Sequence, residues 1–239
     1  SDPLTRSVEI TNVSSRLAGS SGLSVAPTDE QSEFQISDSE FSGNNYRGVT
    51  TAGEFDVSNL SSTTVTSNGG DGVYLESQSV NIANLDVTSN GDDDFSDDYG
   101  ILIDNGQTTA IENTTVTGSS EANIYIDGEP ITRSVAITNV VASQSQTGDG
   151  IAAVATPEQD TITLTNISAV GNGDNGLDLA TAVLNLDQST VNGNGNDGII
   201  ASPDRANITR SSVQNNGDNG IQFVSLGTEA TVSLSSILG

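Results

Sequence analysis

The chain has 239 residues with 32 Asp and Glu, six Arg and no Lys, which gives a formal net charge of −26 at pH 7. Such an acidic surface repels nucleic-acid phosphates and anionic lipid headgroups, so we expect neither nucleic-acid binding nor direct membrane insertion. Cysteine is absent, which excludes disulfides, and the hydrophobic content of 33% is low for an ordinary globular core. A fold with a thin core tolerates such a composition.

A short phrase, Gly or Asn followed by an aliphatic residue, recurs nine times along the chain. Its copies begin at Gly22, Gly48, Gly72, Gly100, Asn123, Gly150, Gly176, Gly198 and Gly220. Successive copies are 22 to 28 residues apart. A period of this length over a whole chain predicts a solenoid with one supersecondary unit per repeat.

Each repeat contains two strand signals with a weaker apolar point between them. The first signal alternates apolar and polar residues and predicts a strand with one buried face, at 8–10, 34–36, 55–57, 80–82, 135–137, 162–164, 184–186 and 232–234. The weaker points are Phe41, Val65, Val87, Val116, Val170, Val191 and Val213. The second signal follows the Gly or Asn, as at 73–75, 101–103, 124–126 and 177–179. Because the units recur in one order, equivalent strands should stack in parallel.

Polar residues recur two positions after the buried aliphatic residue of the first strand. They are Asn12, Asp38, Asn59, Asn84, Asn113, Asn139 and Asn166, followed by Gln188, Arg210 and Ser236. An Asn that lines a turn can bond the same residue in the coils above and below, and also the backbone carbonyls freed at the bend. We therefore predict a structural asparagine ladder inside the solenoid, weakening toward the C-terminus.

The ladder, the Val-x-Ile strands and the Asn/Gly/Asp turns at 172–177, 194–199 and 216–221 resemble the right-handed parallel β-helix family. The resemblance covers nearly all of 7–239. It implies an all-β chain folded as a single right-handed parallel β-helix of about ten coils. One domain would span 1–239, with a lead-in at 1–6 and an incomplete last coil at 229–239. The closest character is that of cell-surface, autotransporter-passenger and adhesin β-helices, although lyases, epimerases, hydrolases and phage tailspikes share the scaffold.

Two tyrosines occupy matching outward positions of the second strand, two coils apart. Tyr74 and Tyr125 therefore form a candidate ligand face. The chain has no His or Lys to act as a base for lyase or epimerase chemistry, and its Arg residues are scattered. We predict no catalytic residue, and an enzymatic role is not favoured.

The densest acidic cluster lies in the longest repeat. It consists of Asp92, Asp93, Asp94, Asp97 and Asp98. Clustered carboxylates repel one another unless cations neutralise them, and oxygen-rich loops suit Ca²⁺. This loop is either a Ca²⁺ site or a solvated acidic loop of a protein adapted to salt.

These features favour a non-enzymatic, extracellular or cell-surface module, such as a stalk, passenger or filament subunit with a structural or adhesive role. The expected partners are further coils or a second copy stacked end to end, because an open solenoid end exposes backbone donors and acceptors. The alternatives are a polysaccharide-active enzyme and a carbohydrate-binding module, for both of which the ligand is a glycan.

Overall fold

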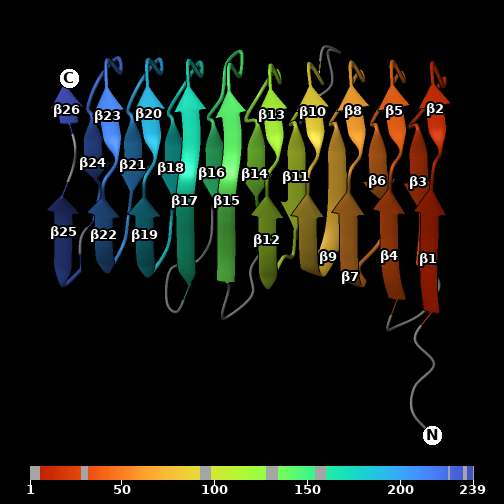
Figure 1. Cartoon of the computed structure of the whole chain (residues 1–239), viewed down its shortest axis with the longest axis horizontal. Helices are drawn as coiled ribbons and strands as arrows, with labels where there is room; N and C mark the ends of the chain where they lie inside the picture. Colours follow the sequence, from red (N-terminus) through yellow and green to blue (C-terminus); the bar gives the residue numbers. More distant parts are fainter. Residues whose placement is uncertain are drawn as a thin grey trace, which may run out of the picture.

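The computed structural model describes residues 6–27, 32–91, 98–127, 134–153, 160–225, 227–233 and 236–238. These residues form strands and turns, with no helix among them. Strands of successive repeats lie side by side in parallel, so the chain winds into a solenoid whose long axis is horizontal in Figure 1. The expected all-β parallel solenoid is confirmed.

The coils have three faces, each a parallel sheet. The first face comprises β1 (Arg6–Thr11), β4 (Ser32–Ser37), β7 (Phe55–Ser61), most of β9 (Val73–Ala83), β12 (Thr108–Glu112), the starts of β15 (Ser134–Ser143) and β17 (Thr161–Val170), β19 (Val183–Asp187), β22 (Arg205–Thr209) and β25 (Glu229–Ser233). The second face comprises β2 (Ser14–Arg16), β5 (Glu40–Ser42), β8 (Thr64–Thr66), β10 (Asp86–Thr88), β13 (Thr115–Thr117), the ends of β15 and β17, β20 (Thr190–Asn192), β23 (Ser212–Gln214) and β26 (Ser236–Leu238). The third face comprises β3 (Leu23–Val25), β6 (Val49–Thr51), the start of β9, β11 (Ile101–Asp104), β14 (Ile124–Ile126), β16 (Ile151–Ala153), β18 (Leu177–Leu179), β21 (Ile199–Ala201) and β24 (Ile221–Phe223).

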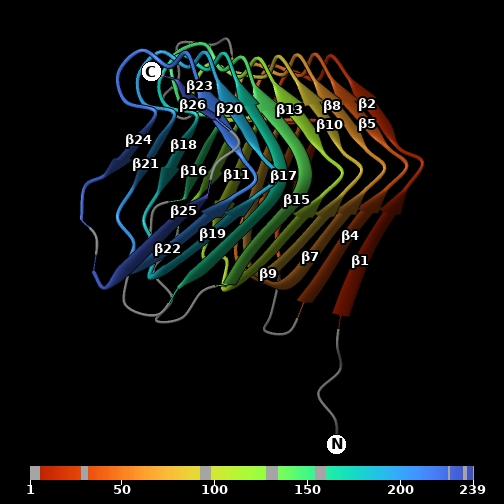
Figure 2. The same cartoon turned by 60° about the vertical axis from the view of Figure 1, so that its left-hand side comes forward.

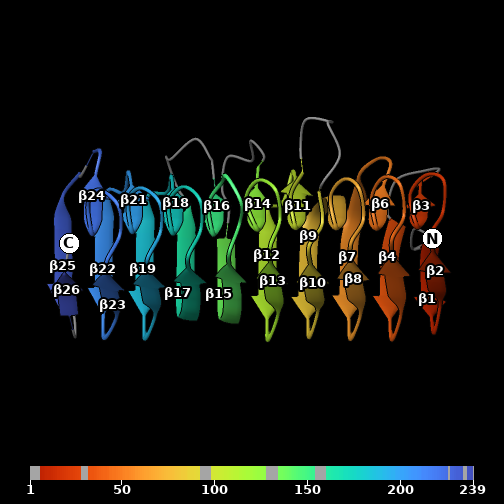
Figure 3. The ribbon, with the colours of Figure 1, turned by 90° about the horizontal axis from the view of Figure 1, so that it is seen from above.

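We number the coils 1 to 10 by their first-face strands, from β1 to β25. Ten such strands bound about nine turns of the solenoid. The first and second faces form the front of Figure 1, and the third face lies behind them; Figure 3 shows the third-face strands on one side and the first-face strands on the other. Pairing continues from coil to coil along the described chain.

Stacked rows of apolar side chains, with one residue per coil in each row, fill the centre of the solenoid. One row on the first face contains Ile36, Leu60, Ile82, Ile111, Ile137, Leu164, Leu186 and Ile208, all at most 1% exposed. Burial of each such side chain contributes about 2 kcal/mol. Each apolar side chain stacks on the equivalent side chain of the next coil, which removes apolar area from water although each coil is narrow. A low hydrophobic content is therefore sufficient.

The register of coil 3 differs from the sequence expectation. The pattern at 55–57 predicts Phe55 and Val57 as the buried pair, but Ser58 and Leu60 pair with Phe34 and Ile36 of coil 2. The Phe55 ring packs on Phe34 with centroids 5.4 Å apart, and both side chains are fully buried. Phe55 thus packs beside the row that contains Phe34, to which coil 3 contributes only the small Ser58.

The residue at the bend between the first and second faces adopts positive φ in coil after coil; Figure 2 shows this bend as a sharp edge. The bend residues are Asn12, Asp38, Ser62, Asn84, Asn113, Asn139, Asn166, Gln188 and Arg210, with φ between 48° and 58°. Asn and Asp tolerate this conformation better than most residues, so the bend itself explains their recurrence.

The residues expected to form the internal ladder therefore lie on the outside. Asn12, Asp38, Asn84, Asn113, Asn139 and Asn166 are exposed at the bend, whereas Asn59 lies within β7 and is partly exposed. Three of them form an outer ladder: Asn139 Nδ2 donates to Asn113 Oδ1 at 3.0 Å, and Asn166 Nδ2 donates to Asn139 Oδ1 at 2.9 Å.

An internal asparagine ladder exists, but at the next corner, between the second and third faces. Asn44 Nδ2 donates to Asn68 Oδ1 at 2.7 Å, and Asn68 Nδ2 donates to Asn90 Oδ1 at 2.8 Å. In later coils, Asn194 accepts from Asn172 and donates to Asn216, each at 2.9 Å. Each side chain also bonds backbone groups at the corner, and all are buried. The ladder is confirmed as a feature of the fold, and its members are corrected.

Coils 5 and 6 carry serine at the ladder position, and Asn123 closes the gap. Ser119 and Ser145 are too short to reach their neighbours, but Asn123 Nδ2 donates to Asn172 Oδ1 at 3.0 Å, 49 residues away. Asn123 replaces the glycine found at this corner in the other coils. A Cβ on Gly176, for example, would lie 2.3 Å from Val191 Cγ1 and 2.7 Å from Asn194 Nδ2. Coil 6 offers Ala142 and Ser145 where the coil beyond Gly176 offers Val191 and Asn194, which leaves room for the Asn123 side chain.

Candidate functional site

All four tyrosines of the chain occur on or beside the third face, in coils 2 to 5. Tyr74 lies in β9 and Tyr125 in β14, with Leu102 of β11 paired between them. Tyr46 and Tyr99 lie in the turns that lead into β6 and β11. Because neighbouring coils are about 4.8 Å apart, the strip from coil 2 to coil 5 is about 15 Å long.

Arg47 lies at one end of this strip, between aromatic rings and a carboxylate. Its Cζ is 4.3 Å from the centroid of the Tyr74 ring and 5.0 Å from that of Tyr46. Its Nε donates to Asp71 Oδ2 at 2.7 Å, and the Asp71 side chain is fully buried. Asp71 Oδ1 accepts the backbone N–H of Tyr99 at 2.9 Å. Asp71 thus connects the guanidinium of coil 2 to the tyrosine of coil 4.

The other end of the strip is a tyrosine stack. The rings of Tyr99 and Tyr125 lie 4.8 Å apart with an interplanar angle of 18°. Between the two ends, the Tyr74 hydroxyl donates to Asp104 Oδ2 at 3.5 Å, the upper limit of a hydrogen bond. Burial, followed by the nearby carboxylates of Asp104 and Glu76, raises the pKa of Tyr74, so this phenol stays neutral and can act as a donor.

Two shallow depressions follow the strip and share two tyrosines. The larger, about 320 Å³, is lined by Arg47, Tyr74, Tyr99, Leu102, Asp104, Tyr125 and Asp127. The second, about 220 Å³, is lined by Tyr99, Glu121, Ala122, Tyr125, Thr147, Gly148 and Asp149. We call the two together the tyrosine groove. It combines flat ring faces with carboxylates, which suits a ligand that stacks and also donates hydrogen bonds.

Carboxylates gather at the far end of the tyrosine groove. Asp149 Oδ1 accepts the backbone N–H of Asn175 at 2.9 Å and its Nδ2 at 3.0 Å. Burial raises the pKa of Asp149 to about 6; the Asn175 bonds oppose this shift, and Asp178 and Asp174 add to it. Burial and the charge of Asp174 also raise the pKa of Asp178. With a pKa of about 6, the carboxyl group of Asp149 can hold or release a proton near neutrality.

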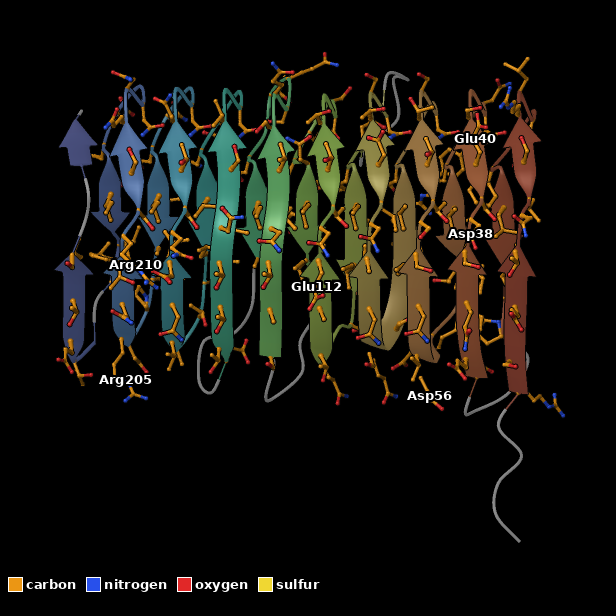
Figure 4. All side chains as sticks on the ribbon, in the orientation of Figure 1. Asp38, Glu40, Asp56, Glu112, Arg205 and Arg210 are labelled. Carbon is orange, nitrogen blue, oxygen red and sulfur yellow. The ribbon has the colours of Figure 1, made fainter. Side chains whose placement is uncertain are left out.

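The front of the molecule offers a different surface. Figure 4 shows Glu112, Arg205 and Arg210 on the first face and its bend, and Asp38 and Glu40 near the second. Depressions here are lined by strand residues such as Asn59, Asn81 and Glu112, or Asn185, Arg205 and Glu229. Exposed ion pairs, Arg16 with Glu40 and Arg210 with Asp187, contribute little to stability because water screens them. Aromatic side chains do not line these depressions, so the tyrosine groove is the stronger candidate.

Residues 71–237 match a family model described as right handed beta helix region. The chain belongs to the right-handed β-helix family. Neither the curated proteins nor the solved structures gave a match to this sequence. Within the described residues, no helix has the length and apolar character required to cross a membrane. The match supports the predicted handedness and fold of this β-helix, and it names no activity.

The structure places Tyr74 and Tyr125 on one face, as the sequence predicts, while ligand binding there stays a prediction. Sequence reasoning did not associate Arg47, Asp71 and Tyr99 with them. Arg47, Asp71 and Tyr99 all precede the corner position occupied by glycine in their coils, so an alignment by that glycine could have grouped them. The contacts of Arg47 with Tyr74 and of Tyr99 with Tyr125 run diagonally from one coil to the next, which an alignment in straight rows does not show.

The predicted metal cluster lies mostly outside the described residues. Asp92, Asp93, Asp94 and Asp97 fall in that category, and Asp98 is described and is buried, with 6% of the residue exposed. Among the described residues, no group of three or more acidic side chains is arranged to hold a metal ion. Calcium binding by this loop therefore stays a prediction.

Proposed function

We propose that this β-helix is an extracellular adhesive module that binds a glycan in the tyrosine groove. The observation that carries the proposal is the gathering of all four tyrosines with Arg47 and Asp104 on one face of the rod. Sugar rings present an apolar face and a rim of hydroxyl groups. Tyrosine rings provide stacking surfaces for the first, and carboxylates and the Tyr74 hydroxyl provide hydrogen-bond partners for the second.

The shape of the groove supports binding of a chain rather than a single sugar. The groove is open and its lining residues come from coils 2 to 6, so an oligosaccharide could lie along the solenoid axis with successive rings over successive coils. The composition supports export, because the chain is acidic and has neither Lys nor Cys. A rigid rod with a lateral binding strip suits attachment at a surface.

Glycan binding is tested by array screening followed by calorimetry with the best oligosaccharide. We expect Tyr125→Ala to weaken binding about tenfold, since loss of a stacking ring costs on the order of 1 kcal/mol or more. Asn81→Ala on the first face is the matched control and should bind as the parent does. Equal binding by both variants, or the absence of any glycan ligand, would refute the proposal.

The carboxylates at the end of the tyrosine groove favour a second candidate, glycoside hydrolysis. This reaction needs one protonated and one ionised carboxyl group near the bond that breaks. Burial raises the pKa of Asp149, which lines the depression beside the stacked tyrosines and suits the role of the protonated group; the other carboxyl groups of the tyrosine groove are candidates for the ionised one. Release of reducing sugar ends that disappears in Asp149→Asn, while binding is retained, would select the enzyme; binding without release would select the adhesive module.

Open strand edges support end-to-end association with further coils or a second copy. In the described residues, β1 pairs with β4 alone and β25 pairs with β22 alone, so each terminal strand has one unpaired edge. Light scattering at increasing protein concentration should show a rise in mass. A monomeric mass at all concentrations would argue against self-association.

A further inference from the structure

Arg47 shows how the third face accommodates a positive charge. Its guanidinium lies over the Tyr74 ring and beside the buried Asp71, so the cation contacts both a π face and a carboxylate. Both contacts favour a cation, and they favour it more strongly when water is partly excluded. The Arg47 side chain is 19% exposed, so this arrangement is largely screened from solvent.

The rest of the tyrosine groove has the same two components without a second basic side chain. Arg47 is the sole basic residue among the described residues that line it, and its charge is balanced by Asp71. Asp104, Glu121 and Asp149 line the remaining length beside the Tyr99–Tyr125 stack. The groove is therefore acidic.

Among the described residues, the other arginines lie away from the groove, which leaves it acidic on a larger scale. Arg6 and Arg16 belong to coil 1, and Arg205 and Arg210 belong to coil 9 on the front of the rod. With a net charge of −26 for the whole chain, the field at the groove attracts cations and repels anions. Uronate and sulfate groups are thus disfavoured as ligands.

We infer that the ligand of the tyrosine groove is a cationic glycan, a polymer of protonated amino sugars. This inference rests on the proposed glycan binding. The apolar face of each sugar ring stacks on Tyr125 or Tyr74, and the ammonium groups pair with the carboxylates of Asp104 and Glu121. The ligand would thus be held by an aromatic ring and a carboxylate, the same two kinds of group that hold the Arg47 guanidinium.

Calorimetry in mildly acidic buffer, where the amine is protonated, tests the inference with four oligomers of equal length. They are β-1,4-linked glucosamine, its N-acetylated form, the glucose oligomer and oligogalacturonate. We expect the glucosamine oligomer to bind about tenfold more tightly than the two neutral ones, the range of a charge-assisted hydrogen bond, and this advantage should fall as salt is added. Oligogalacturonate should bind most weakly.

Variants separate the charge effect from folding. Asp104→Asn and Glu121→Gln should each reduce the preference for glucosamine severalfold while binding of the neutral oligomers is retained. Glu112→Gln, on the first face, loses the same charge and should keep the full preference. Equal affinity for charged and neutral oligomers, or tighter binding of oligogalacturonate, would overturn the inference and leave glycan binding intact. Binding of none of the four would count against both.

Discussion

Replacing Asp149 by asparagine should stabilise the protein at neutral pH and leave its stability unchanged in acid. The side chain is largely buried in the turn before β16, with Asn175 as its hydrogen-bond partner. Burial raises its pKa from 3.8 to about 6. The raised value means that the folded protein disfavours the charged carboxylate relative to the unfolded chain.

The magnitude follows from the pKa difference. A shift of about 2 pKa units at about 1.4 kcal/mol each corresponds to about 3 kcal/mol at most. Below pH 3.8 the carboxyl is protonated in both states and carries no penalty. As the pH rises through the interval from 3.8 to about 6, the penalty develops, and above about 6 it is complete. Asparagine has no charge and retains an oxygen that can accept both bonds from Asn175.

The assay is urea unfolding of the parent and of Asp149→Asn at several pH values. The free energies of unfolding should coincide near pH 3.5 and diverge by about 2 to 3 kcal/mol in favour of the variant at pH 7. Asp218→Asn removes one exposed carboxylate from a comparable turn and serves as the control; it should show no such divergence. A constant difference between Asp149→Asn and the parent at all pH values would show that burial of charge is not the cause.

Three further predictions concern the ladder, the corner glycine and the acidic loop. Asn194→Ala should destabilise the protein by about 3 kcal/mol, because it leaves the buried backbone N–H of Asn172 and the carbonyl of Ala169 without partners. The control, Asn196→Ala, changes an exposed side chain and should cost well under 1 kcal/mol. Similar urea midpoints for the two variants would refute the stabilising role of the ladder. Gly176→Ala should prevent folding or cost several kcal/mol of stability, since its Cβ would lie 2.3 Å from Val191 Cγ1. In the control, Gly19→Ala, the added Cβ meets no atom within 4 Å, so this variant should be tolerated. Thermal unfolding of both variants followed by circular dichroism tests the prediction. Calorimetric titration with Ca²⁺ should release or absorb heat and raise the melting temperature if the loop at 92–98 holds the ion, and the absence of both effects would leave a solvated acidic loop.

The sequence predicts the architecture of this β-helix well because the same physical demand recurs in every coil. Alternating apolar residues such as those at 80–82 must bury one face, and a period of 22 to 28 residues leaves parallel stacking as the consistent arrangement. The register prediction failed at Phe55, because this aromatic residue continues the alternation although it lies outside the stacked rows, and Ser58, which pairs with Phe34, gives no apolar signal.

The placement of the asparagines could not be read from the sequence, because two different demands select the same residue. The bend at Asn139 requires positive φ, and the corner at Asn194 requires an amide that both donates and accepts. Composition at a repeated position does not distinguish these demands. The sequence predicts only part of the tyrosine groove for a related reason. Tyr74 and Tyr125 occupy equivalent strand positions and are therefore recognisable as a pair, whereas Arg47 and Tyr99 contact them from turns in neighbouring coils.

Asn123 limits how the rod can be edited. Its amide spans coil 6 to reach coil 7, and its side chain is accommodated by the small residues Ala142 and Ser145. Coils 5, 6 and 7 must therefore be kept together when coils are inserted or deleted. Whole coils can be inserted or removed between coils 8 and 9, where Gly198 lies against Val213 and Asn216, the same residue types that Gly176 meets. A change within coils 5 to 7 would leave the Asn123 amide without its acceptor and without the space that Ala142 and Ser145 provide.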